Sequence, residues 1–107
     1  MSNTVFQSFY FKDDLGYKMA INALTKRDED WFTADKEGLC LHYSNKYGIA
    51  PLLEVVEPLN VDFIYSESDD YSERDYTCLF VGGESTYLSD DEYGSRLPEI
   101  RKMGFKL

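Results

Sequence analysis

The 107-residue chain contains few of the residues from which catalytic and metal sites are usually built. It has one histidine, His42, and two cysteines, Cys40 and Cys78, which form neither a CxxC pair nor a recognised metal-ligand spacing. Basic residues are scarce too: the chain has 11 lysines and arginines but 20 aspartates and glutamates, which gives a net charge of −9. Nucleic acids and anionic membranes should repel such a chain. We therefore expect no metal, no cofactor, no nucleic acid and no membrane as its partner, but a basic protein surface.

Long apolar segments are also missing. No stretch approaches the ~18 apolar residues of a membrane span. The apolar run at 5–11 has no basic region before it and includes Gln7 and Ser8, which makes a poor signal-peptide core. Two isolated cysteines do not form the disulfide framework that is typical of small secreted proteins. A single disulfide between Cys40 and Cys78 stays an alternative. These absences predict a cytoplasmic protein.

The chain does contain enough apolar side chains for a core. Apolar residues make up 43% of it and aromatic residues 16%, well above the content of a disordered chain. A chain of this length can bury one core without staples, so we expect one domain at 1–107.

Apolar periodicity predicts alternating strands and helices. Leu15, Met19 and Ala23 recur at helical spacing after the possible caps Asp13 and Asp14. In order, the patterns predict a strand at 4–11, a helix at 15–27, strands at 31–34 and 39–43 around a turn at 35–38, a helix at 51–56, and strands at 61–65 and 76–81. Beyond residue 84 we expect a short strand near Tyr87 and Leu88, an acidic loop, and a terminal segment from Pro98.

This order predicts an α+β fold of the ferredoxin-like, split βαβ kind: strand-helix-strand-strand-helix-strand. Its antiparallel sheet would carry both helices on one face. The strand at 76–81 would add a C-terminal hairpin strand, joined to the fourth strand by a loop at 66–75. Because the edges of such sheets can pair, a homodimer stays open.

The negative charge is unevenly distributed. The segment from Asp62 to Glu99 holds eleven acids and only two bases, so it alone carries −9, while the rest of the chain sums to zero. Two dense clusters contain tyrosine and serine among the acids. We predict that they bind the partner, through Glu67, Asp69, Asp70, Tyr71, Glu73, Asp75, Asp90, Asp91, Glu92 and Tyr93.

In an extended chain, Asp69, Tyr71, Glu73 and Asp75 would point the same way, about 6.6 Å apart. Phosphates of duplex DNA follow one another at a rise of about 3.4 Å per strand, so such an array could imitate a phosphate backbone. The simpler interpretation is that both clusters are solvated loops. Two other functions stay open: an adaptor or immunity-type module with specificity in Tyr65, Tyr71, Tyr87 and Tyr93, and a small enzyme using paired carboxylates or His42 beside Cys40.

The segment from Leu41 to Glu84 resembles a family of small ferredoxin-like domain proteins of plasmids and phages. The likeness consists of a strand ending near Tyr43, the Pro-led helix Pro51–Val56, and strands at 61–65 and 76–81 around an acidic turn. It covers less than half of the chain, and the Trp-rich stretch of that family is reduced here to Trp31.

That resemblance implies a mobile-element origin, and in composition the chain is similar to small acidic phage inhibitors of host defence, of the anti-CRISPR or anti-restriction type. Together with the charge pattern, it leads us to expect a non-enzymatic inhibitor. Its acidic surface would face a nucleic-acid-binding defence protein in the host cytoplasm.

Overall fold

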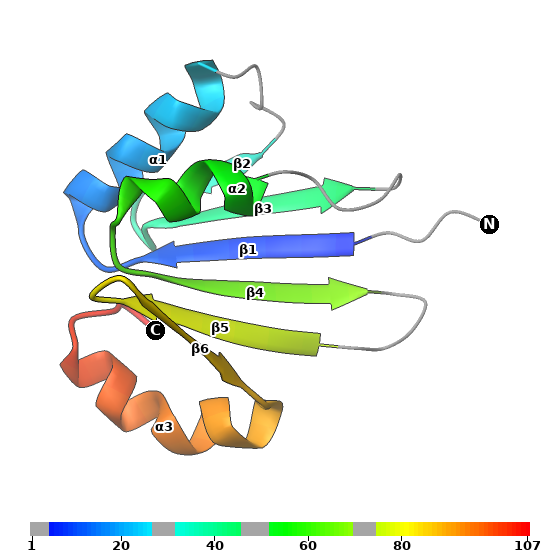
Figure 1. The fold of residues 1–107 in the computed structure, drawn as a ribbon, viewed down its shortest axis with the longest axis vertical. Helices are drawn as coiled ribbons and strands as arrows, with labels where there is room; N and C mark the ends of the chain where they lie inside the picture. The colour runs from blue at the N-terminus through cyan, green and yellow to red at the C-terminus, as the bar shows by residue number, and fades with distance from the viewer. Residues whose placement is uncertain (1–4, 27–31, 46–51, 70–74) are drawn as a thin grey trace.

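The computed structural model describes residues 5–26, 32–45, 52–69 and 75–107. In these residues it is an α+β domain with a six-stranded antiparallel sheet and three α-helices (Figure 1). The elements are β1 (Val5–Phe11), α1 (Asp14–Lys26), β2 (Thr33–Asp35), β3 (Cys40–Asn45), α2 (Leu52–Val56), the 3₁₀ helix η1 (Glu57–Leu59), β4 (Phe63–Asp69), β5 (Asp75–Val81), β6 (Glu84–Leu88) and α3 (Asp90–Lys102).

The strands lie in the order β2-β3-β1-β4-β5-β6, and every neighbouring pair is antiparallel. The first strand is therefore central, with β3 on one side and β4 on the other. Ser8 of β1, for example, lies opposite His42 of β3 and Ser66 of β4. The predicted hairpin of β4 and β5 is present, and β6 extends the sheet beyond it.

Helix α1 begins where the sequence predicts, but it buries a different face. A carboxylate oxygen of Asp13 accepts a hydrogen bond from the backbone N–H of Gly16 at 2.8 Å and so caps the helix. Tyr17, Ala20 and Leu24 are buried, whereas Leu15, from the predicted apolar row, is 68% exposed. Of the predicted row, Leu15 and Met19 are exposed and Ala23 is partly buried. The buried stripe is displaced toward Tyr17, whose ring packs edge-on against Phe11.

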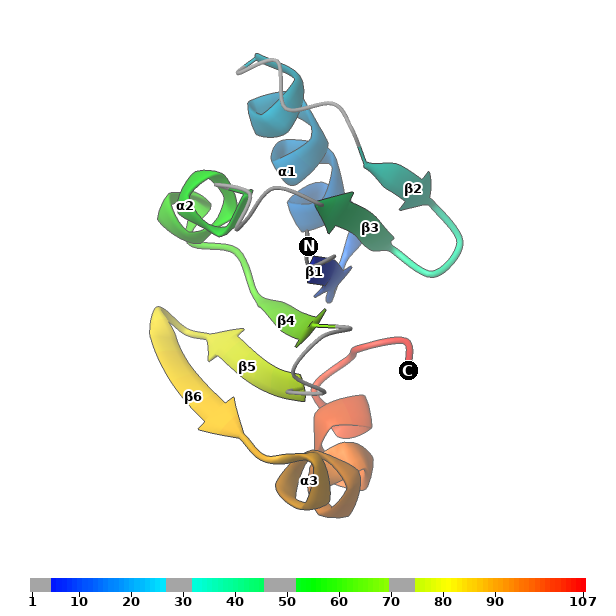
Figure 2. The same cartoon turned by 90° about the vertical axis from the view of Figure 1, so that its right-hand side faces the viewer.

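One face of the sheet packs against α1 and α2. Phe9 and Phe11 of β1 and Phe63 and Tyr65 of β4 point into this core and form a set of ring contacts. Next to it, Phe63 stacks on Phe80 with ring centroids 4.4 Å apart. Both helices therefore lie on one side of the sheet, as predicted (Figure 2).

The other face packs against α3, which the sequence reasoning missed. Its core holds Ile64, Leu79, Leu88, Ile100 and Phe105, with Tyr10 and Tyr93 partly buried beside them. Figure 2 shows α3 on the side of the sheet opposite α1 and α2. Because β4 lies between two cores, its consecutive residues Phe63, Ile64 and Tyr65 are all buried.

The C-terminal region corrects two predictions. The acidic stretch at 89–93 is the start of α3 and not a loop, and Pro98 lies inside this helix instead of opening a terminal segment. The missing N–H of Pro98 would have paired with the carbonyl of Gly94, four residues earlier. Both residues are exposed, so water can satisfy that carbonyl.

Strands β4 and β5 are longer than predicted at the end where they are joined. They reach Asp69 and start again at Asp75, so residues 66–69 and 75 of the predicted loop belong to strands, and the rest of it lies outside the described residues. The ends of several other predicted elements lie outside the described residues: Thr4, Arg27, Trp31 and Pro51.

Candidate functional site

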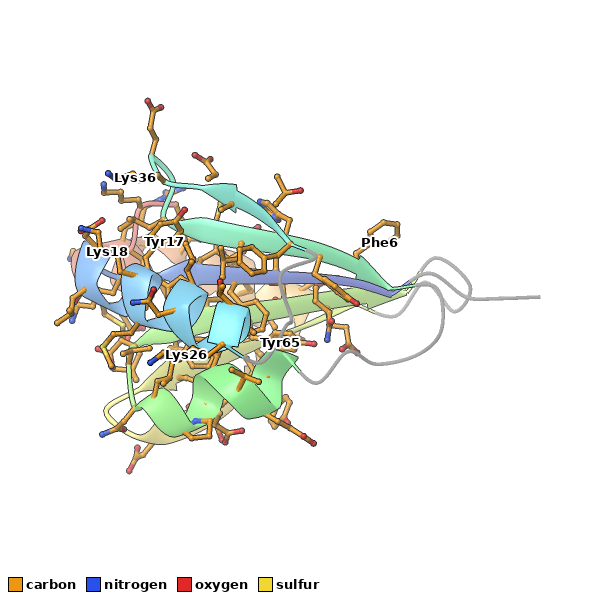
Figure 3. The ribbon with its side chains drawn as sticks, turned by 90° about the horizontal axis from the view of Figure 1, so that it is seen from above. Phe6, Tyr17, Lys18, Lys26, Lys36 and Tyr65 are labelled. Carbon is orange, nitrogen blue, oxygen red and sulfur yellow. The ribbon has the colours of Figure 1, made fainter. Side chains whose placement is uncertain are left out.

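Several of the described basic side chains lie at one end of the sheet along the strand direction, among acids such as Asp14 and Asp62. Lys12 at the end of β1 forms a 3.5 Å ion pair with Asp62, and its methylenes lie over Gly104, just after α3. Arg101 and Lys102 occupy the last turn of α3 at this same end. Figure 3 shows Lys18 and Lys36 there too, far from Phe6. We call this the basic end.

The opposite end carries acids. It contains the end of β4 with Glu67 and Asp69, the start of β5 at Asp75, and the first turn of α3 with Asp90, Asp91 and Glu92. We call this the acidic end; in Figure 1 it is the side toward which the β4 arrow points. The described parts of two predicted clusters that are separated in sequence therefore lie at one end of the sheet.

Part of this acidity has a structural role in α3. The hydroxyl of Ser89 accepts a hydrogen bond from the Glu92 N–H, and the Glu92 carboxylate accepts one from the Ser89 N–H, both at 3.2 Å. This capping box satisfies two helix-end donors, and acids in the first turn also oppose the helix dipole. Asp90 and Asp91 are exposed, and within the described chain neither forms an ion pair.

Tyr93 belongs to the core more than to the surface. It is half-buried against the cluster beneath α3. Burial raises the pKa of its hydroxyl above the usual value, and the nearby Tyr10 adds to the rise. Its ring therefore helps to anchor α3 on the sheet and offers a partner little surface.

Glu67 faces the α1/α2 side of the sheet. The Tyr65 hydroxyl donates a 2.6 Å hydrogen bond to Oε1 of Glu67 and accepts another of 2.6 Å from Nε2 of Gln7. Gln7 is only 1% exposed, and its Oε1 has no hydrogen-bond partner. The carboxylate of Glu67 thus ends a polar chain that begins in the core.

A cleft opens between this end of the sheet and the start of α3. Its volume is about 230 Å³, and it is lined by Phe6, Ser8, Ser66, Glu67, Ser68, Thr77 and Asp90. Ser8, Ser66 and Thr77 lie opposite one another on adjacent strands and on the face that α3 partly covers. Since side chains alternate along a strand, Glu67 borders the cleft between two serines while its carboxylate points to the other face. Sequence reasoning missed this cleft because it depends on the pairing register of three strands.

The carboxylate array predicted for a single strand is wrong. Asp69 ends β4 and Asp75 begins β5, two antiparallel strands in which Asp75 lies opposite Ser68. The other predicted members, Asp70, Tyr71 and Glu73, lie outside the described residues.

The acids of 62–99 do not all gather at the acidic end either. Asp62 is paired with Lys12 and accepts a 3.1 Å hydrogen bond from the Gly82 N–H at the basic end. Glu99 is paired with Arg96 within α3.

Cys40 and His42 do make contact. His42 Nε2 lies 3.3 Å from the Cys40 sulfur, and His42 Nδ1 lies 2.9 Å from the Ser8 hydroxyl. Burial, together with the charge of Asp35, raises the pKa of the Cys40 thiol, which favours the unreactive thiol over the thiolate that a nucleophile needs. Both cysteines are free and buried, so the disulfide left open above is not formed.

Three further observations bear on what the chain can do. Among the residues described, no three His, Cys, Asp or Glu side chains are placed to share a metal ion. No helix in the described ranges is long and apolar enough to cross a membrane. Comparison with protein-family models, with curated proteins and with solved structures found no match to this chain.

Proposed function

We propose that this chain is a non-enzymatic, acidic binding domain whose acidic end occupies a basic, nucleic-acid-binding surface of a host defence protein. The observation that carries the proposal is that the described parts of the two acidic clusters lie at one end of the sheet, although the carboxylate of Glu67 faces the α1/α2 side. The first turn of α3, with Asp90, and the β4–β5 hairpin, with Glu67, border the same cleft, while Lys12, Arg101 and Lys102 lie at the other end.

This polarity would orient the domain on its partner. A basic surface attracts the acidic end more strongly than the other end, where Lys12 and Lys18 are paired with acids, so encounter is steered and one orientation is favoured. Exposed acids such as Asp90 and Asp91, with no ion pair among the described residues, can meet new cations without breaking a bond. The carboxylates of the acidic end would imitate the phosphates of a nucleic acid through their negative sign and their density. They would not need the regular spacing of phosphates.

We also infer that the first six elements form a ferredoxin-like unit. The strand order β2-β3-β1-β4 and the position of α1 and α2 on one face support this inference. In that description β5, β6 and α3 are additions at the β4 edge. These additions supply the other half of the cleft, since Thr77 and Asp90 come from β5 and α3.

The adaptor alternative has one observation in its favour. Tyr87 is 70% exposed on the edge strand β6, whereas Tyr65 is buried and Tyr93 half-buried; Tyr71 lies outside the described residues. A tyrosine-centred interface would therefore have to form around Tyr87 at the β6 edge. Pairing of this edge into a homodimer stays a prediction.

The test is capture from host-cell lysate on immobilised protein at low and high salt, followed by elution with short duplex DNA. We expect proteins that bind at low salt and are released by DNA, because both compete for one basic surface. The triple reversal Asp69→Lys, Asp70→Lys and Glu73→Lys should abolish this capture.

A matched control changes the net charge equally at exposed acids elsewhere: Glu54→Lys, Glu57→Lys and Glu84→Lys. It should keep most of the capture if position matters more than total charge. Capture that survives the first triple reversal, or that duplex DNA leaves in place, contradicts the proposal. Loss of capture only on Tyr87→Ala would favour the adaptor function instead.

A further inference from the structure

We propose that the cleft beside Asp90 is a pocket for one arginine side chain of the partner protein. This inference rests on the proposed function and specifies the chemistry by which the acidic end recognises its partner. It starts from the lining of the cleft, which combines two acids, four hydroxyl side chains and one aromatic ring. Of the two acids, only Asp90 can face the cleft, because the Glu67 carboxylate points to the other side of the sheet.

The floor of the cleft is rich in hydrogen-bond acceptors. The hydroxyls of Ser66 and Thr77 lie 3.3 Å apart across β4 and β5, and the hydroxyl of Ser8 meets His42 Nδ1 at 2.9 Å on the other side. A hydroxyl oxygen has two lone pairs, so each of these groups can accept a further hydrogen bond while keeping its neighbour.

The walls supply charge and an apolar surface. Asp90 enters from the first turn of α3, whose three acids outweigh the roughly half positive charge of a helix N-terminus. Phe6 of β1 lies at the same end of the sheet, paired with Ser68 of β4, and is 44% exposed. Figure 3 shows its ring at the tip of the sheet, pointing away from α1 and α2. An aromatic ring beside an acid attracts a cation that can stack.

These features fit guanidinium better than ammonium or a metal ion. Guanidinium is planar, carries five N–H donors, and stacks on rings, whereas the compact lysine ammonium keeps its water more strongly. The cleft volume of about 230 Å³ is several times the roughly 30 Å³ that one water molecule occupies. That leaves room for the planar group and part of its methylene stem. Among the described residues no metal-binding group of three ligands is present.

The experiment is an NMR titration of the ¹⁵N-labelled full chain with three blocked amino acids: N-acetyl-arginine amide, N-acetyl-lysine amide and N-acetyl-citrulline amide. Citrulline keeps the shape of arginine without its charge. We expect arginine to bind with a dissociation constant on the order of 1–10 mM, as befits a fragment of an interface. Shifts should centre on Phe6, Ser66 and Thr77, with lysine at least threefold weaker and citrulline without effect.

Two variants make the assignment specific. Asp90→Asn should weaken arginine binding at least fivefold while α3 stays folded, since Ser89 and Glu92 retain the capping box. Asp14→Asn removes another exposed acid, which lies at the basic end in the first turn of α1, and should leave binding unchanged. Equal binding of arginine and lysine, matching shifts from citrulline, or full binding by Asp90→Asn would each overturn the inference.

The outcome is separable from that of the proposed function. If salt-sensitive, DNA-displaced capture is seen but arginine leaves the cleft resonances unmoved, the arginine pocket fails and the acidic binding domain stands. If arginine binds as expected but capture does not depend on the acids of the β4–β5 connection, the pocket stands and the proposed function fails.

Discussion

Ser89 and Glu92 each bond to the other's backbone N–H at 3.2 Å, and this exchange fixes the start of α3. Ser89 immediately precedes the exposed acids Asp90 and Asp91. The position of Asp90 and Asp91 at the acidic end therefore depends on a cap that is local in sequence.

Replacing Ser89 by alanine should lower the free energy of unfolding by about 1 kcal/mol, the usual loss for an N-cap. The physical reason is that the N–H of Glu92 loses its acceptor at the helix end. Urea unfolding followed by circular dichroism measures the change. Ser95→Ala is the matched control, because the Ser95 hydroxyl only donates to the Glu92 carbonyl at 3.1 Å. Equal losses for both variants would show that the cap does not anchor α3.

Pro98→Ala should stabilise the domain by about 1–3 kcal/mol, since proline inside a helix is about 3 kcal/mol less favourable than alanine and part of the gain is offset in the unfolded chain. The new N–H can pair with the Gly94 carbonyl. If Pro98 instead opened a terminal segment, as the sequence suggested, alanine would bring no gain. Pro58→Ala serves as the control, because Pro58 occupies the first turn of η1. Urea midpoints of the two variants decide between these descriptions.

The success and failure of the sequence predictions have physical causes. Strand β1 was predictable because its segment is rich in aromatic and β-branched residues, and helix α1 because a capping aspartate precedes apolar residues at helical spacing. Helix α3 was not: Gly94 and Pro98 interrupt it, and its three leading acids suggested a loop. Yet Ser89 and Glu92 have the spacing of a capping box, and that signal would have located the helix start.

The candidate site was predictable only in part. The count of acids pointed to both clusters, and the structure brings Glu67 and Asp90 to one end. The count of acids could not show that Asp62 would be paired with Lys12. Nor could it show that Ser8, Ser66 and Thr77 would lie side by side. Those facts depend on strand register, which a single sequence leaves open.

Tyr65→Phe should cost about 1–3 kcal/mol of unfolding free energy, because the buried Nε2 of Gln7 loses its acceptor and Glu67 loses its donor. Gln7→Met, similar in length and apolar, should cost less, since it removes the unpaired Oε1 and keeps the bond from Tyr65 to Glu67. Urea unfolding compares the two. Tyr87→Phe, on an exposed residue, should change stability by no more than about 0.5 kcal/mol. A larger loss for Gln7→Met than for Tyr65→Phe would contradict this account of the polar chain.

The thiol of Cys40 should react slowly with alkylating agents at neutral pH. Burial raises its pKa and the neighbouring Asp35 charge raises it further, so the reactive thiolate forms only at higher pH than in an ordinary cysteine. Asp35→Asn removes the charge while its Oδ1 can still accept the turn hydrogen bonds from Glu37 and Gly38. The pKa of Cys40 should then fall, and the pH–rate curve for iodoacetamide should move to lower pH.

The measurement uses a Cys78→Ala background, so that only Cys40 is modified. Glu37→Gln, which removes an exposed acid of the same turn, should leave the curve in place because no interaction of Glu37 contributes to the raised pKa. A fast reaction of the unaltered protein at neutral pH would mean that Cys40 is an activated thiolate beside His42. That result would favour the alternative of a small enzyme that uses Cys40 and His42. The proposal that the chain is non-enzymatic would then be wrong.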